Sequence, residues 1–469
     1  MARLSAIYLT CVYCILCVCC KSSHKSNASE SSMSETAVVA RANTNDPFAI
    51  SPNGSFLVHA PTGIIQSERI YESIFDVRDV RSSRQVATIK LPVQAKTGFQ
   101  FRDVEFCDHG RYLLAVGPVI TIYPGQDPAS TAGDLITAAS EDFVKILDMK
   151  YNSLHADISL STAEHSFPPE ALARYKQINP EWHLRKEWHG EVRFAACAAN
   201  APIAAIVINF GNEMSTVKIL NLDTGAETQE FGGILGQTNV VGLAVSPQGS
   251  SLALFGEGNA PGAHDLNDHR ITTVDLQSKK IIRAVGVKSS TNFASVSIAY
   301  AGESTIAVEL VDREYLGYSP SDPPQLQYRS HDHASVHFFD VQTGSESQVI
   351  SDPSVDDFSL KGISADGRIM LAYAGKSRIC KSCNDGSGEQ EVTDARFTLW
   401  NRETGQPIGR SPELKIVHHT CPWFRWLSWG SCVASDETPT LKLSQDGHAV
   451  VASWVSGGEP IQVYSLPTQ

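Results

Sequence analysis

The sequence predicts an all-β protein, a seven-bladed β-propeller whose blades are each built from four strands. Two observations predict this fold. A unit consisting of an apolar strand, a tight turn and a second apolar strand occurs seven times, and each unit is followed by a third strand. The ends of consecutive third strands are 54 to 73 residues apart. Repetition at this scale is typical of blades that stack around a central channel.

The first strand of each unit leads into a tight turn that contains glycine in six copies and asparagine in one. Apolar residues alternate as in strands, and glycine permits the positive φ that hairpin turns require. The seven first strands with their turns cover residues 48–54, 104–110, 192–200, 241–249, 296–302, 360–367 and 441–447.

The third strands end at an Asp or Asn in six units and at Ser in the last. These ends are Asp79, Asp148, Asn221, Asp275, Asp340, Asn401 and Ser465. In three units a Thr-Gly pair follows, as at Thr343 and Gly344, and marks a turn into a fourth strand. Two packed β-sandwiches would give no reason for the same residues to recur in seven copies.

The last unit leaves no room for a fourth strand before the end of the sequence, whereas residues 36–42 form a spare β-prone segment ahead of the first unit. We therefore expect this N-terminal segment to complete the last blade. The ring would then close without an exposed strand edge.

Several of these motifs resemble those of the WD40 and YVTN-type seven-bladed propeller families. They are Ser51-Pro52-Asn53-Gly54, Ser246-Pro247-Gln248-Gly249 and Trp400-Asn401 followed by Thr404-Gly405. The resemblance runs from about residue 37 to the end, although no unit has the Gly-His dipeptide of strict WD40 repeats ahead of its first strand. It implies a ring of seven blades.

Residues 1–20 are predicted to be a signal peptide, a lipoprotein signal or an uncleaved membrane anchor, because residues 4–20 are almost entirely apolar or Cys. Cys19 or Cys20 would be the lipidated residue. Residues 21–35 are polar and are expected to form a disordered tether, followed by the propeller over residues 36–469. These features predict an extracytoplasmic protein, either held at a membrane in the periplasm or at the cell surface, or secreted.

The charge of the chain argues against nucleic acid as a partner. Lys and Arg number 38 against 51 Asp and Glu, giving a net charge of −13. An acidic chain without a basic block repels phosphate backbones.

Six long insertions fall in connections between second and third strands or between blades, which all open on one face of a propeller. They cover residues 117–141, 161–191, 256–270, 312–334, 375–395 and 411–439. Long connections on a rigid scaffold are the usual place of binding sites. We therefore expect a protein- or peptide-binding scaffold that works through this face.

Aromatic residues in two insertions are candidate binding residues. Trp423, Trp426 and Trp429 recur every three residues with Arg425 between them, which suits a peptide, sugar rings or a lipid surface, or else a small local core. Trp182 and Trp188 form a second cluster that either faces a ligand or packs its insertion onto the ring.

Cysteines in the insertions are candidates for disulfides if the protein is exported. The expected pairs are Cys380 with Cys383 and Cys421 with Cys432, with zinc binding by the same residues as the alternative. Cys107 and Cys197 lie in first strands and are expected to be small buried residues.

His331, Asp332 and His333 form the best candidate metal site, which would suit a divalent cation. The alternative functions are accordingly a metal-assisted hydrolase or lyase, or a glycan-binding propeller. Without such a metal no cofactor is expected, since phosphate-binding and hydrolase motifs are missing. The inner strands carry few charges, although Asp103, Glu105, Arg193 and Lys361 lie near them.

Overall fold

The computed structural model describes the residues that form the blades and many of their connections. These are residues 31–39, 47–61, 63–65, 70–72, 74–91, 97–99, 101–123, 136–159, 191–209, 215–232, 237–258, 269–287, 297–318, 326–379, 390–419, 435–454 and 460–466.

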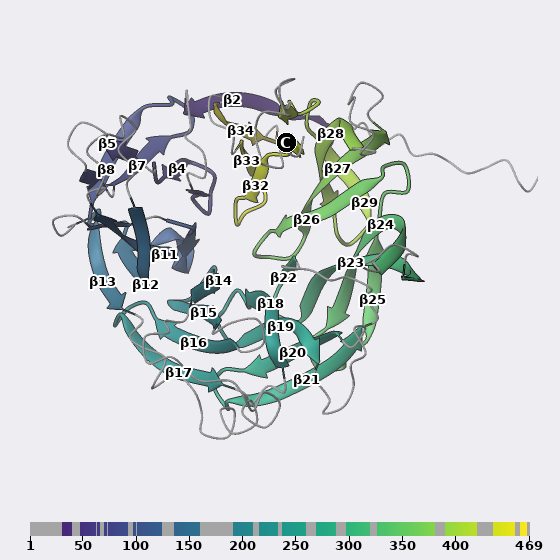
Figure 1. Ribbon diagram of the computed structural model, residues 1–469, viewed down its shortest axis with the longest axis horizontal. Helices are drawn as coiled ribbons and strands as arrows, with labels where there is room; N and C mark the ends of the chain where they lie inside the picture. Colours follow the sequence, from purple (N-terminus) through teal and green to yellow (C-terminus); the bar gives the residue numbers. More distant parts are fainter. Residues whose placement is uncertain are drawn as a thin grey trace, which may run out of the picture.

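Seven antiparallel sheets stand in a ring around a central opening (Figure 1), which confirms the predicted propeller. Blade 1 contains β3 (Phe48–Ile50), β4 (Phe56–His59), β7 (Ile74–Asp79) and β8 (Gln85–Lys90). Blade 2 contains β10 (Asp103–Cys107), β11 (Tyr112–Tyr123), β12 (Ile136–Asp148) and β13 (Ser153–Ser159). Blade 3 contains β14 (Glu191–Cys197), β15 (Ile203–Asn209), β16 (Ser215–Asn221) and β17 (Ala226–Gly232). Blade 4 contains β18 (Gln237–Val245), β19 (Ser251–Gly258), β20 (His269–Asp275) and β21 (Lys280–Val287).

The remaining blades follow the same order. Blade 5 contains β22 (Ile298–Tyr300), β23 (Thr305–Tyr318), β24 (Leu326–Asp340) and β25 (Glu346–Ile350). Blade 6 contains β26 (Asp357–Ile363), β27 (Ile369–Ile379), β28 (Gln390–Asn401) and β29 (Gln406–Arg410). Blade 7 contains β32 (Thr440–Leu443), β33 (Ala449–Ser453), β34 (Ile461–Ser465) and β2 (Ser34–Val39). All seven predicted third-strand ends are the last residues of the observed third strands.

The N-terminal strand completes the last blade, as predicted. β2 pairs antiparallel with β34, from Ser34 opposite Ser465 to Val39 opposite Ile461. A preceding two-residue strand, β1 (Ser31–Ser32), pairs parallel with β29 of blade 6. Strand structure therefore begins inside the segment that the sequence assigned to the tether.

Buried serines order the turns between first and second strands. The Ser364 hydroxyl donates to Asp366 (2.6 Å) and accepts a hydrogen bond from the N–H of Ile369 (2.9 Å). Ser51 and Ser444 make the same pair of bonds in blades 1 and 7. Gly367 follows with φ of +76°, where an added Cβ would lie 2.3 Å from the Ala301 carbonyl carbon of blade 5. Both the backbone conformation and the close approach therefore require glycine.

The hydrophobic core is divided into seven clusters, one at each junction between neighbouring blades. The cluster between blades 7 and 1 includes Val38 of β2 together with Val451 and Val463. Each blade thus buries both of its faces against neighbours, which gives the ring its stability.

The ring has two faces that carry different connections. The turn side bears the first-to-second and third-to-fourth turns of each blade, and the insertion side bears the second-to-third connections and the links between blades. On the insertion side, parts of three predicted loops are strands. β10 pairs with β11 only up to Val116, β22 with β23 up to Val308, and β26 with β27 up to Gly375. The second and third strands of these blades continue as paired ribbons beyond those residues.

Smaller strands accompany these ribbons on the insertion side. β9 (Thr97–Phe99) pairs with the extended part of β11. Two short hairpins are formed by β5 (Gly63–Ile65) with β6 (Ile70–Glu72) and by β30 (Val417–His419) with β31 (Ser435–Glu437).

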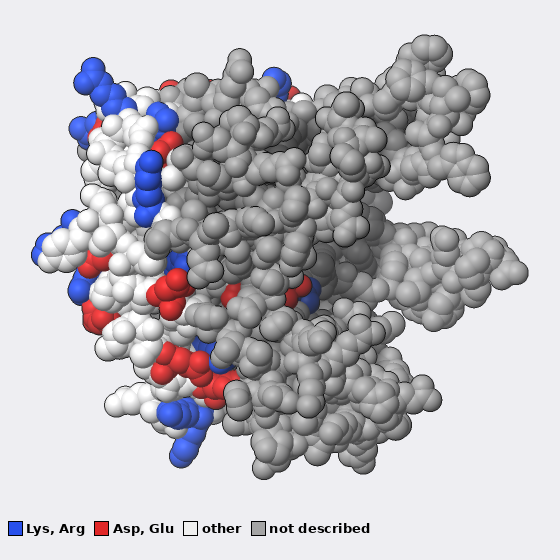
Figure 2. All heavy atoms as spheres, turned by 60° about the vertical axis from the view of Figure 1, so that its left-hand side comes forward, with Lys and Arg blue, Asp and Glu red and all other residues white. Residues whose placement is uncertain are grey.

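Figure 2 shows the side of the ring that bears blades 1 and 2. Acidic and basic groups are interspersed over the described surface of this side. No basic patch covers the described part of that side.

Candidate functional site

The first strands of all seven blades line a cavity of about 350 Å³ in the central channel. Most of the lining consists of apolar side chains and backbone, in line with the few charges predicted for the inner strands. Ala, Val, Leu and Ile occupy most of the positions. Four charged side chains interrupt this lining. They are Asp103 and Glu105 of blade 2, Lys361 of blade 6 and Lys442 of blade 7.

A β-bulge places Lys361 at the channel. Leu360 pairs with Ala372 and Gly362 with Leu371, so Lys361 is the extra residue between them. A bulge turns a side chain out of the regular alternation. Arg193 occupies a similar bulge in β14, but blade 3 lines the cavity with Ala195, Ala196 and Cys197. Of the two cations that the sequence singled out near the inner strands, Lys361 is therefore the one that lines the cavity.

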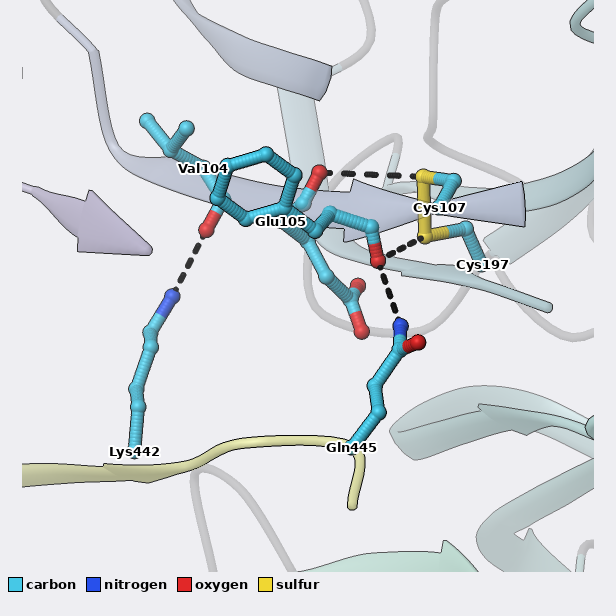
Figure 3. The surroundings of a disulfide bond; sticks show 7 residues. Val104, Glu105, Cys107, Cys197, Lys442 and Gln445 are labelled. Atoms are coloured by element: carbon cyan, nitrogen blue, oxygen red, sulfur yellow. Dashed lines mark hydrogen bonds between the residues drawn. A yellow bond between two sulfur atoms is a disulfide. The ribbon is translucent and has the colours of Figure 1, made fainter. Parts of the chain in front are cut away.

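Lys442 joins blade 7 to blade 2 across the channel wall. Its Nζ donates to Asp103 Oδ1 (2.7 Å) and to the backbone oxygen of Val104 (2.8 Å). Gln445, also of blade 7, donates from Nε2 to the backbone oxygen of Phe106 (2.9 Å). Figure 3 shows the Glu105 side chain leaving β10 toward the space between Lys442 and Gln445. These bonds fix the backbone that carries Glu105.

Burial in the channel raises the pKa of the Glu105 carboxyl group to about 8, and the Asp103 charge adds to this effect. Lys442 and the backbone N–H of Cys197 oppose it, with a smaller effect. Desolvation disfavours the charged form of a carboxylic acid, and a neighbouring carboxylate does the same. Glu105 therefore carries its proton at neutral pH and can donate a hydrogen bond into the cavity.

Cys107 and Cys197 form a disulfide, with their Cα atoms 5.6 Å apart. The sequence correctly placed both in first strands and correctly predicted them to be buried, but it did not predict that they are bonded to each other. β10 and β14 are neighbouring innermost strands, which brings the two residues within disulfide range. The sulfur atoms lie 3.7 and 3.4 Å from the backbone oxygens of Glu105 and Phe106 (Figure 3). The bond thus lies directly behind Glu105.

The turn-side mouth of the channel is acidic but its carboxylates are held within turns. Glu303, Asp366 and Asp446 line a hollow of about 640 Å³ there. Asp366 and Asp446 accept hydrogen bonds from serine hydroxyls of their own turns. Glu303 accepts from the backbone N–H of Gln248 and from the Ser250 hydroxyl, which joins blades 4 and 5. These hydrogen bonds order the turns and join blades 4 and 5, so the acidic residues at this mouth have a structural role.

A groove of about 990 Å³ separates blades 1 and 2 on the turn side. Two of the large hydrophobic side chains in its lining are unusually exposed, Phe56 at 40% and Val86 at 54%. Lys150 lies at the same groove. The groove provides a second concave surface on the ring, on the face opposite to the insertions.

Most site residues predicted from the sequence lie outside the described residues. These are Cys19, Cys20, Trp182, Trp188, Cys380, Cys383, Cys421, Trp423, Arg425, Trp426, Trp429 and Cys432. The backbone of His331, Asp332 and His333 belongs to β24, so His331 lies in a strand, although it falls in the insertion 312–334 that was predicted as a long connection.

The described residues contain no group of three or more His, Cys, Asp or Glu side chains arranged to hold a metal ion. They also contain no helix long and apolar enough to span a membrane.

Lys442 was missed from the sequence, although a signal for it exists. The pairs Leu360-Lys361 and Leu441-Lys442 occupy the same place in their repeats, near the start of the first-strand segment. Aligning the repeats would have placed both lysines near the channel. Cys107 and Cys197 likewise stand three residues before the turn residues Gly110 and Asn200 of neighbouring units.

Comparisons with known proteins give no family assignment. No protein-family model matches the chain, and no curated protein sequence matches it. Among solved structures, the chain is similar to the β-propeller domain of Cps50 (Swd1) from Myceliophteria thermophila, with 9% identity, a TM-score of 0.49, and coverage of 92% of this chain and 100% of that chain. The WD40 repeats of RRP9 give 10% identity, a TM-score of 0.49 and coverage of 93% and 99%. Hydrazine synthase from Kuenenia stuttgartiensis gives 11%, 0.46, and coverage of 92% and 98%. The assignment of the fold rests on the seven sheets described above.

Proposed function

We propose that this propeller is an extracytoplasmic scaffold that binds a protein or peptide on its insertion side and is held at a membrane by its N-terminal segment. The observation that supports it best is the set of strand ribbons that rise past the blades on that side alone. In blade 5, residues 311–318 continue beyond Leu310, which is still part of the core between blades 4 and 5. At ~3.3 Å per residue they reach about 26 Å.

Paired ribbons are better suited to recognition than irregular loops. Each ribbon satisfies its own backbone hydrogen bonds and therefore has a defined backbone conformation, which lowers the entropy lost on binding. Blades 2, 5 and 6 carry such ribbons, so they surround one mouth of the channel from different directions. A partner large enough to touch several of them is a folded protein or a long peptide.

The Cys107–Cys197 disulfide supports the proposed compartment. Disulfides persist in oxidising environments outside the cytoplasm and are rare inside it. The apolar N-terminal residues and the polar stretch after them favour export and tethering on independent grounds.

A propeller enzyme is the second candidate, and the charged group in the channel is the observation that favours it. A protonated carboxyl group next to an Asp–Lys pair can act as a general acid. Among the described residues of the channel, the lysine beside a carboxylate is Lys442, and both Asp103 and the Val104 carbonyl group hold it in the wall. No Ser or Cys nucleophile next to a base accompanies Glu105 in the described lining, so binding is the better supported function. A third candidate is glycan binding through Trp423, Trp426 and Trp429. These residues lie outside the described part of the chain.

The test is chemical crosslinking through lysine in the native host, followed by mass spectrometry. We expect partner peptides to be joined to Lys90, Lys376 and Lys415, which lie on the insertion side. Replacing residues 313–330 with an Asn-Gly turn, which shortens the blade 5 ribbon, should reduce these crosslinks several-fold while the protein stays folded.

Lysines on the turn side provide the internal control. Lys150 and Lys279 lie in third-to-fourth turns and should yield few partner crosslinks. Partner crosslinks concentrated at Lys150, beside the groove between blades 1 and 2, would contradict the proposal and move the interface to the other face.

A further inference from the structure

We propose that the central channel binds a small organic carboxylate between the Lys361 ammonium group of blade 6 and the Glu105 carboxyl group of blade 2. This site is separate from the protein-binding face, since it lies among the first strands inside the ring. Three observations support the proposal: the cavity in the channel, the pairing of its charges, and the local structure that holds the two groups in place. Lys361 lies at a bulge, and hydrogen bonds from blade 7 hold the strand that carries Glu105.

The two lysines that line the cavity differ in their partners: Lys442 has an ion pair, whereas within the described residues the charge of Lys361 acts on the Glu309 carboxyl group without forming one. Asp103 and Lys442 neutralise each other through their 2.7 Å ion pair. The Lys361 ammonium group lies 5.9 Å from the centre of the Tyr373 ring and makes no ion pair within the part of the chain that is described. An ammonium group at a cavity lined largely by apolar side chains attracts an anion, because low-dielectric walls strengthen that attraction.

Glu105 determines which anion fits. Its side chain leaves the strand toward the space between Lys442 and Gln445 (Figure 3). Burial favours the neutral acid at pH 7, so the group offers an O–H donor rather than a repelling charge. A carboxylate can accept this hydrogen bond at one oxygen and pair with an ammonium group at the other.

The remaining groups at the cavity do not compete for the ligand. The Tyr300 hydroxyl is hydrogen-bonded to the Ser251 hydroxyl (2.9 Å), and burial raises the pKa of Tyr300 well above its usual value. Gln445 is bound to the Phe106 carbonyl. Glu309, which does not line the cavity, accepts from the backbone N–H of Leu360 (2.8 Å); burial raises the pKa of its carboxyl group, and the charge of Lys361 opposes this effect.

The size and lining of the cavity define the class of ligand. A volume of about 350 Å³ is at the low end for small-molecule sites. The walls between the two polar groups are formed by apolar side chains such as Ile298, Leu243 and Ile363. The ligand is therefore a small carboxylate with an apolar body, rather than a polyanion or a sugar.

The probe is 4-fluorobenzoate, followed by ¹⁹F NMR titration of the purified full chain, with neutral 4-fluorobenzamide as the matched compound. We expect the acid to bind at least about tenfold more tightly than the amide at pH 7.

The variants test the role of the cation. Lys361→Met should reduce the affinity for the acid about tenfold and leave the affinity for the amide unchanged. Lys150→Met, which removes a cation outside the channel, should change neither. Equal affinity of acid and amide for the wild type would overturn the proposal without any variant.

The pH dependence tests the role of Glu105. Above pH 8 the group becomes a carboxylate that repels the probe, so the affinity should fall roughly fivefold between pH 8 and pH 9. Glu105→Gln keeps a hydrogen-bond donor and removes the titration, so its affinity should stay constant over this range. An identical fall of affinity in wild type and Glu105→Gln would remove Glu105 from the site. Thermal unfolding of each variant confirms that it is folded.

Discussion

Single Asp and Asn side chains at the ends of third strands order the turns that follow them. Asp340 Oδ1 accepts from the backbone N–H of Thr343 (2.7 Å) and from its hydroxyl (2.8 Å). Asn221 and Asn401 accept from the N–H of Thr224 and Thr404 in the same way, at 3.0 Å each. The recurrence of Asp or Asn, with Thr three residues later, is therefore explained by one hydrogen-bonded turn.

These turns give the protein a defined sensitivity to acid. Hydrogen bonds from turn N–H and hydroxyl groups lower the pKa of Asp79, Asp275 and Asp340 from 3.8 in the folded state. As the pH falls toward this value, the unfolded chain takes up protons first, so the stabilising contribution of the three aspartates is present above it and is lost below it. The triple variant Asp79→Asn, Asp275→Asn and Asp340→Asn should keep its thermal stability at pH 7, because the amide oxygen accepts the same bonds.

The measurement is the melting temperature as a function of pH. We expect the wild type to lose more stability than the triple variant between pH 5 and pH 3. Parallel curves would mean that other carboxylates control acid unfolding.

Some of these residues could be placed from the sequence, and others could not. Turn residues act on neighbours a few positions away, so Gly367 and Asp340 could be placed from the repeat alone. The Cys107–Cys197 disulfide joins residues 90 positions apart, and Lys442 reaches Asp103 across 339 positions. Such pairs depend on which strands become neighbours once the ring closes, and no local pattern encodes that distance.

Among the elements, β2 has the most consequence for the integrity of the ring. It covers the outer edge of β34, and its residue Val38 is buried at the junction of blades 7 and 1. The register could be anticipated only within a few residues, since the predicted segment was 36–42 and the observed strand is Ser34–Val39. Strand alternation shows that a segment is β-prone, but its partner fixes where the pairing starts.

Shortening one side chain of β2 should measurably destabilise the protein. Val38→Ala removes buried methyl groups from the junction and should lower the free energy of unfolding by about 1–2 kcal/mol. Ser34→Ala, on the exposed part of the same strand, should have little effect. Urea unfolding compares the two variants. Deletion of residues 31–39 should in addition expose the β34 edge and cause self-association, detected by light scattering. A monomeric deletion variant with wild-type stability would show that β2 is dispensable.

The extended ribbons of blades 2, 5 and 6 show why insertions are hard to interpret from sequence. In residues 309–318 charged residues such as Asp312 and Arg313 interrupt the apolar alternation. The segment therefore has the composition of a loop. Pairing of Arg313 with Ser330 and of Tyr315 with Tyr328 nevertheless continues the sheet, because each strand supplies the backbone partner of the other. The sequence located the insertions and their common side, but not their secondary structure.

At the scale of the whole molecule, the single disulfide of the described residues joins blades 2 and 3 and closes a loop of 90 residues. Joining distant points of the chain restricts the unfolded state, and a disulfide contributes typically about 2–4 kcal/mol, with longer loops toward the upper end. The same bond stands behind Glu105 in the channel wall. The stability of the ring and the position of the Glu105 backbone therefore both depend on this bond.

Reduction should accordingly destabilise the wild type through this bond. Because the chain has 11 cysteines, the effect is isolated by comparison with the double variant Cys107→Ala and Cys197→Ala. We expect dithiothreitol to lower the free energy of unfolding of the wild type by about 2–4 kcal/mol more than that of the variant. Equal effects on both proteins would assign the loss of stability to other cysteines.

The redox state of the same pair in the native host tests the proposed compartment. Cells are treated with acid and then with an alkylating reagent, so that free thiols are labelled before any exchange occurs, and the labelled peptides are identified by mass spectrometry. We expect Cys107 and Cys197 to be joined and unlabelled, because an extracytoplasmic protein keeps its disulfides. If both were labelled in the cell while the purified protein showed the bond, the propeller would reside in a reducing compartment. The proposal of an exported, tethered scaffold would then fail, while the channel site, tested on the purified chain, would stand or fall on its own measurements.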